Sequence, residues 1–136
     1  MNITKNLCFS IFALALTACG SSPSWDGYSP AEANKLQAMG VSAEEAAHYR
    51  EMGFTSGTVQ TWHDQGITIP HNVTAWHDAH FSASEAGAWH AAGFSLKDAY
   101  EWREKKFSAA DAKLWRDADK SPREAEKMRK KGQAPG

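Results

Sequence analysis

Histidine is the residue type whose number and spacing most suggest chemistry in this chain. Six histidines occur in 136 residues, and two of them stand at i and i+3 in the segment His77-Asp78-Ala79-His80. On a helix this spacing places both imidazoles on one face, where they could bind the same ion. The sequence therefore offers a candidate zinc or copper site with His77 and His80 as ligands and His71 as a third.

A repeat gives the same histidines a second interpretation. His63, His77 and His90 each follow a tryptophan directly, and in most other units an arginine occupies the equivalent position, the ninth. A cation or donor at the end of a helix is favoured by the macrodipole without any metal. Packed helices stand about 8 to 10 Å apart, too far for equivalent histidines to share an ion. Helix-end histidines thus compete with the metal site, and four arginines become candidate partner contacts: Arg50, Arg103, Arg116 and Arg129.

The repeat has a period of 13 residues and predicts the architecture. Its eight units begin at Ser29, Ser42, Thr55, Thr68, Ser82, Ser95, Ser108 and Ser121. Most carry an acidic residue at position four, which with the first hydroxyl resembles a capping box, and many carry glycine at position twelve, which suits the residue after a helix. Because such short helices are marginal alone, we predict an all-α array of about eight short capped helices, packed as helical hairpins.

The tryptophans recur at the eighth position of five units and predict the core. An aromatic stripe could instead stack on sugars of peptidoglycan or lipopolysaccharide, but other units place Leu36, Tyr49 and Met128 there, which favours burial. The fourth unit has Pro70 and one extra residue. We expect it to interrupt the stacking and divide the array into two halves.

Charge is distributed unevenly along the repeats. Residues 19–94 contain two cations and eight acids, whereas residues 95–136 contain twelve cations and eight acids. The basic end, from Arg123 to Lys131, could face anionic phosphates or simply be a solvated terminal helix. The sequence shows no serine nucleophile in a strand-turn-helix context and no phosphate-binding loop, so we do not expect an enzyme. A nucleic-acid partner is not expected in the compartment that the N-terminal segment specifies.

The N-terminus has the layout of a signal peptide. One cation precedes an apolar run of about a dozen residues, whereas a membrane span needs roughly 20. The run ends in Leu16-Thr17-Ala18-Cys19, which resembles the lipobox of bacterial lipoproteins. The resemblance implies removal of residues 1–18 and lipid, including palmitate, on Cys19. Residues 19–28 would then form a lipidated tether, and residues 29–136 the repeat domain. Since no aspartate follows the cysteine, the resemblance also implies the outer membrane in a Gram-negative host.

Together these features predict a non-enzymatic lipoprotein, anchored to the membrane of the bacterial envelope, that interacts with a protein or with peptidoglycan. The alternative is a periplasmic binder of a metal or small ligand through the histidine-rich middle repeats.

Overall fold

The computed structural model describes residues 24–136. Cys19 and the predicted signal peptide lie outside the described residues. Eight α-helices of nine residues follow one another: α1 Pro30–Ala38, α2 Ala43–Glu51, α3 Ser56–Asp64, α4 Pro70–Asp78, α5 Ala83–Ala91, α6 Leu96–Glu104, α7 Ala109–Asp117 and α8 Pro122–Lys130. The described part of the chain contains no strand, which confirms the predicted all-α array. None of these helices combines the length and apolar character that a bilayer span needs.

The start of each helix is fixed by the first residue of its unit. In seven helices a serine or threonine hydroxyl accepts a hydrogen bond from the backbone of the residue three further on, and four of these form complete capping boxes. Each such cap is worth about 1 kcal/mol. Helix α4 differs, because Ile69 precedes it and offers no side-chain bond. The extra residue of the fourth unit is accommodated here.

The end of each helix is a tight turn with a left-handed residue. In the fifth unit Gly93 has φ +75°, and the next amide, of Phe94, donates to the carbonyl of Trp89 at 3.0 Å. This pattern satisfies carbonyls that the helix leaves free. Three units place a non-glycine residue at the left-handed position: His80, Lys106 and Asp119, with φ between 55° and 61°. His80 is thus a helix-ending residue by position.

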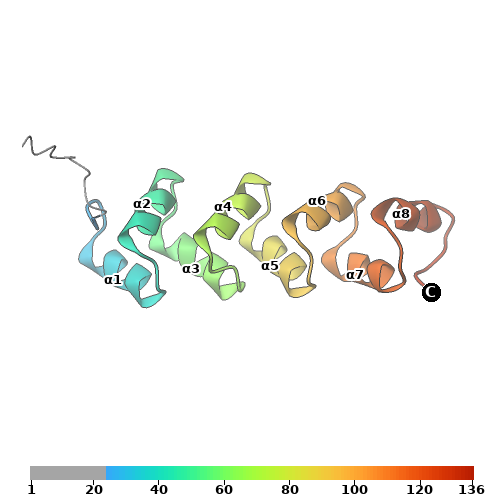
Figure 1. Cartoon of the computed structure of the whole chain (residues 1–136), viewed down its shortest axis with the longest axis horizontal. Helices are drawn as coiled ribbons and strands as arrows, with labels where there is room; N and C mark the ends of the chain where they lie inside the picture. The colour runs from blue at the N-terminus through green and yellow to red at the C-terminus, as the bar shows by residue number, and fades with distance from the viewer. Residues whose placement is uncertain (1–23) are drawn as a thin grey trace, which may run out of the picture.

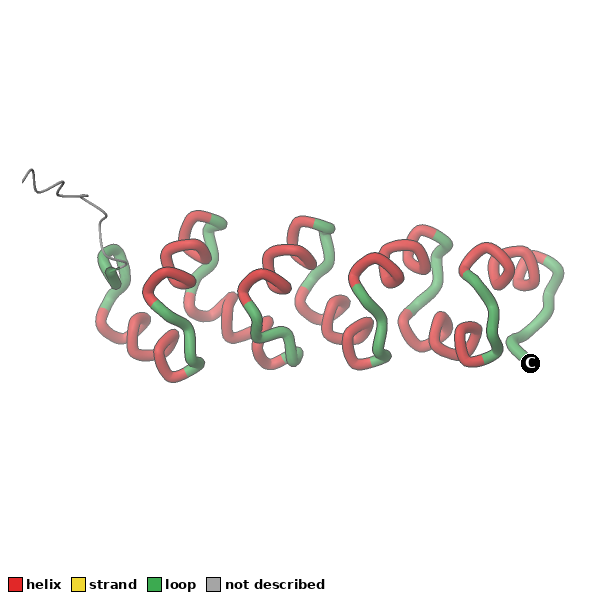
Figure 2. The backbone as a smooth tube through the Cα atoms, in the orientation of Figure 1, coloured by secondary structure: helices red, strands yellow, loops and turns green. Residues whose placement is uncertain are grey.

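The helices alternate between two rows along a rod (Figures 1 and 2). Helices α1, α3, α5 and α7 form one row, in which each contacts the next, and α2, α4, α6 and α8 form the other. Helix α4 keeps its place in this alternation, so the expected division into two halves is wrong. The array is also more continuous than a series of hairpins, because helices contact both their sequence neighbours and the helices two units away.

The core runs the length of the rod and is aromatic. All five repeat tryptophans are at most 5 % exposed, which confirms that they are core residues rather than a sugar-binding platform. Phe81, Phe94 and Phe107, which end their units, each pack edge-on against the tryptophan of the same unit. The ring centroids of Trp102 and Phe107, for example, are 5.2 Å apart. Phe107 also meets Trp115 of the next unit at 6.3 Å. These contacts join neighbouring units into one core.

The two ends of the rod are closed differently. At the N-terminal end Trp25 and Tyr28 pack on the core, and the Tyr28 hydroxyl donates to the carbonyl of Ala46 at 2.6 Å. The last residues of the predicted tether therefore belong to the folded array. At the C-terminal end, Lys120 and Gln133 replace the apolar residue that ends most other units. The core is thus formed within residues 25–128.

Candidate interaction surface

The arginines at repeat position nine have partners inside the chain. Arg103 donates to the carbonyls of Ala79 and His80 at 2.9 and 3.1 Å. Both carbonyls lie just beyond the end of α4, two units earlier, and the guanidinium carbon of Arg103 stands 3.6 Å from the centroid of Phe81. The guanidinium thus satisfies helix-end carbonyls and makes a cation–π contact. We call this arrangement the arginine clamp.

The arginine clamp recurs with the same two-unit offset. Arg116 donates to Ala92 and Gly93 and lies 4.2 Å from Phe94. Arg129 donates to the carbonyls of Lys105 and Lys106 at 2.6 and 2.9 Å and lies 3.9 Å from the Phe107 ring. The clamp therefore links α6, α7 and α8 each to the preceding helix of its own row.

Arg50 makes a shorter version of the clamp at the N-terminal end. It bonds to the carbonyl of Asp26 and lies 5.7 Å from the Tyr28 ring. The segment 25–28 thus takes the part of a preceding unit. The sequence predicts these four arginines as exposed contacts for a partner, but in the structure each of the four guanidinium groups donates a hydrogen bond within the chain. Contact with a partner through them stays a prediction, and the open surface lies elsewhere.

Histidine takes the clamp position in the three middle units. His77 packs edge-on against Phe54, the residue that ends the second unit, at 4.9 Å. His63 is partly buried, and its Nε2 has no hydrogen-bond partner among residues 24–136. Burial lowers the pKa of His63, while Asp64 and Glu45 partly oppose this. The ninth position is therefore an inter-unit contact in the fourth unit as well.

The three histidines predicted as metal ligands are spread along α4 and beyond its end. His71 lies in the first turn of α4, His77 in its last turn and His80 beyond its end. The Nδ1 of His77 lies 3.4 Å from a carboxylate oxygen of Asp78. Within residues 24–136 no three histidine, cysteine or acidic side chains are arranged to hold a metal ion. The metal site therefore stays a prediction, and the structure shows no point at which three of these side chains could bind one ion.

The acids at position four serve as helix caps. Glu85 accepts from the Ser82 backbone at 2.9 Å and from its hydroxyl at 2.8 Å. These bonds lower the pKa of Glu85, and similar bonds lower the pKa of Glu32 and Glu124. The carboxylates are thereby held ionised as caps.

Two adjoining grooves lie along the row of even-numbered helices. The first has a volume of about 550 Å³ and is lined by the end of α4 and the start of α6: Ala79, Ser95, Leu96, Lys97, Tyr100 and Glu101. The second, of about 380 Å³, lies between α6 and the start of α8, and its lining includes Tyr100, Glu101, Glu104, Lys105 and Arg123. We call them together the Tyr100 grooves, because this half-exposed ring, 47 % accessible, borders both.

The Tyr100 grooves combine an apolar floor with a charged rim. Their walls are mostly apolar atoms, and the rim carries both acids and cations. Sequence reasoning missed this surface, because tyrosine at position six of a unit has no counterpart in the repeat pattern. That departure from the pattern was the available signal. Comparison of the chain with protein-family models, with curated proteins and with solved structures found no match.

Proposed function

We propose that this protein is a non-enzymatic lipoprotein of the bacterial envelope. Lipid on Cys19 would anchor it to a membrane, in a Gram-negative host the outer membrane, and the helical array would bind a protein or peptidoglycan. The array has its own aromatic core and arginine clamps.

The Tyr100 grooves carry the interaction part of this proposal. The first groove falls within the size range of about 300 to 1,000 Å³ typical of ligand sites. A large aromatic ring beside apolar walls and a mixed-charge rim is the composition expected at the centre of a protein interface. Tyr100 would be the main contact, with Glu101 and Lys97 at the rim.

The test is capture of partners from envelope extracts by the unlipidated chain. Tyr100→Ala should abolish capture of the specific partner. Leu114→Ala is the matched control, since Leu114 is also an exposed apolar residue, 57 % accessible, but lies on α7 outside the grooves. Equal capture by the Tyr100 variant and the wild type would remove the grooves from the proposal.

The anchor has a separate test. Detergent-phase partitioning of the full-length protein in cells should be lost in Cys19→Ser. Persistence of partitioning in that variant would contradict lipidation at this cysteine.

A further inference from the structure

The terminal helix carries three exposed cations along one side. Arg123 and Lys127 of α8 and its C-cap residue Lys131 are spaced four residues apart, so they lie along one side of the helix. We call them the outer stripe. Ala125, fully buried, lies about 200° around the helix from Arg123. Lys127 and Lys131 therefore lie on the side away from the array, whereas Arg123 stands at the edge of the second Tyr100 groove.

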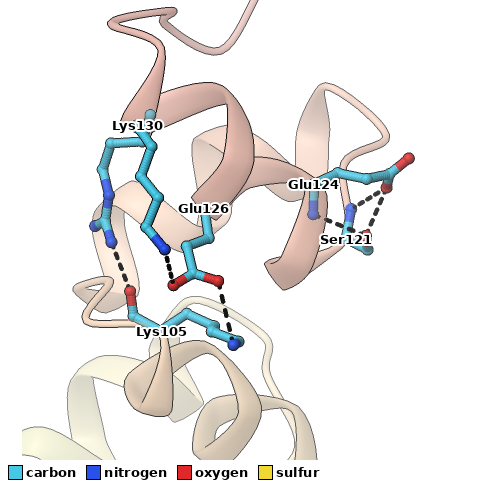
Figure 3. Close-up of polar contacts among 6 residues, drawn as sticks. Lys105, Ser121, Glu124, Glu126 and Lys130 are labelled. Atoms are coloured by element: carbon cyan, nitrogen blue, oxygen red, sulfur yellow. Dashed lines mark hydrogen bonds and ion pairs between the residues drawn. The ribbon is translucent and has the colours of Figure 1, made fainter.

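Two further cations of α8, Lys130 and Arg129, are already paired. Lys130 contacts Glu126 at 3.0 Å, and Glu126 also contacts Lys105 of α6 at 3.2 Å (Figure 3). Arg129 forms the last arginine clamp. In contrast, no side chain of the outer stripe forms an ion pair or hydrogen bond with any residue between 24 and 136.

The outer stripe stands on a well-anchored helix. The Ser121 hydroxyl and the Glu124 carboxylate complete a capping box at its start (Figure 3), and Arg129 and Glu126 tie α8 to α6. A frayed terminal helix would lack these bonds. The backbone that carries the three cations is thus held against the array.

Helix stability does not account for all of the outer stripe. Lys131 at the C-terminal end is favoured by the macrodipole, but Arg123 sits in the first turn, where the dipole disfavours a cation. Arg123 also has no carboxylate partner between residues 24 and 136 to offset this. A ligand outside the chain would supply the missing negative charge.

We propose that the outer stripe binds the surface of a membrane that contains anionic phospholipid. Lipid phosphates would be contacted by the guanidinium and ammonium groups, which are the side chains suited to phosphate oxygens. The rest of the molecule sets the orientation. Residues 24–94 carry two cations and eight acids, so the opposite half of the rod is repelled by such a surface while the α8 end is attracted.

The position of α8 makes this a contact at a distance from the proposed anchor. The N-terminal segment and α8 lie at opposite ends of the rod (Figure 1). Four helices in a row at about 10 Å each give a length of roughly 40 Å. If Cys19 holds one end to its membrane, the outer stripe meets an opposing anionic surface. Only this last step rests on the proposed lipid anchor.

The experiment is vesicle co-sedimentation with the unlipidated chain, residues 19–136 carrying Cys19→Ser. Vesicles of phosphatidylcholine alone are compared with vesicles that also contain phosphatidylglycerol. We expect binding only to the anionic vesicles, weakening with added salt. The triple variant Arg123→Gln, Lys127→Gln, Lys131→Gln should bind about 100-fold more weakly.

The matched control removes three exposed cations elsewhere: Lys35→Gln, Lys97→Gln and Lys106→Gln. It changes the net charge by the same amount and should keep most of the binding. Circular dichroism verifies that both variants are helical. An equal loss in both variants would overturn the proposal, because net charge alone would then explain binding.

Two other results would also overturn it. One is equal binding to neutral and anionic vesicles. The other is a combination of two observations: the wild type does not bind vesicles, and it forms a dimer, detected by ultracentrifugation, that the outer-stripe variant does not form. That result would assign the outer stripe to the acidic half of a second copy. Since the tested chain carries no lipid, failure of the Cys19 anchor would appear only in detergent partitioning.

Discussion

The arginine clamp makes a quantitative prediction at Arg103. Arg103→Ala removes two hydrogen bonds, of 2.9 and 3.1 Å, and the contact with the Phe81 ring at 3.6 Å. In this partly exposed position we take about 1 kcal/mol for each hydrogen bond and about 0.5 kcal/mol for the cation–π contact. The better helix propensity of alanine returns about 0.2 kcal/mol. The expected loss in the free energy of unfolding is about 2 kcal/mol.

The assay is equilibrium unfolding in urea, followed by circular dichroism and tryptophan fluorescence. Lys97→Ala is the control, because it removes an exposed cation of the same helix that makes no ion pair with any residue in 24–136. Its effect should stay within about 0.5 kcal/mol. Arg103→Lys keeps the charge but cannot donate to both carbonyls at once. Its loss in the free energy of unfolding should therefore lie between those of Lys97→Ala and Arg103→Ala.

A double-mutant cycle separates the ring contact from the hydrogen bonds. Phe81→Leu in the Arg103→Ala background should cost about 0.5 kcal/mol less than in the wild type. If Arg103→Ala were no more destabilising than Lys97→Ala, the clamp would contribute nothing to the joining of units, and our reasoning would be refuted.

Three further predictions concern packing, acidity and metal. Gly87→Ala should destabilise by about 1 kcal/mol despite better helix propensity, because its Cβ would lie 2.7 Å from a side chain of the α3 C-cap. Gly57→Ala, whose added Cβ would have its nearest neighbour at 3.5 Å, should be neutral or stabilising in the same urea unfolding assay. The lowered pKa of His63 means that the unfolded chain binds the proton first. The contribution of His63 to the free energy of unfolding is therefore fully present above the unfolded pKa of about 6.5 and is lost as the pH drops below it. In His63→Gln the decrease in stability at low pH should be smaller. An unchanged pH profile of urea midpoints would contradict this. Calorimetric titration with zinc should show no tight stoichiometric site, since residues 24–136 contain no group of three histidine, cysteine or acidic side chains that could hold an ion. A stoichiometric signal lost in His77→Ala/His80→Ala would restore the metal hypothesis.

The sequence predicted the elements well because the signals are local. Hydroxyl caps and helix-ending glycines act within one unit, and their positions are legible from the period of 13 alone. The buried tryptophans followed from the same alignment. The unit with Pro70 was misjudged, because an uncapped start at Ile69 absorbs the added residue in a loop without moving α4 from its row.

The surface was less predictable, because it depends on contacts between units that are not adjacent. Arg103 looks like an exposed helix-end cation until α4 and Phe81 are placed beside it. A correlation within the chain did carry this information. Where the unit two earlier ends in a phenylalanine, the ninth position is arginine in three cases and His77 in the fourth. Where that earlier unit ends in Val41 or Ile67, the ninth position is a histidine, His63 or His90. The Tyr100 grooves could not be predicted, because they depend on how far apart α4, α6 and α8 lie in their row.

The replacement of the final apolar residue in the last two units has a consequence for the length of the rod. Each clamp reaches back two units, so only the last two lack a successor that would cover their closing turn. There the chain places Lys120 and Gln133, which tolerate water. Duplication of a two-unit block whose units both end in phenylalanine, such as residues 82–107, should therefore lengthen the rod in register, whereas duplication of residues 95–120 would place Lys120 at an interior closing position.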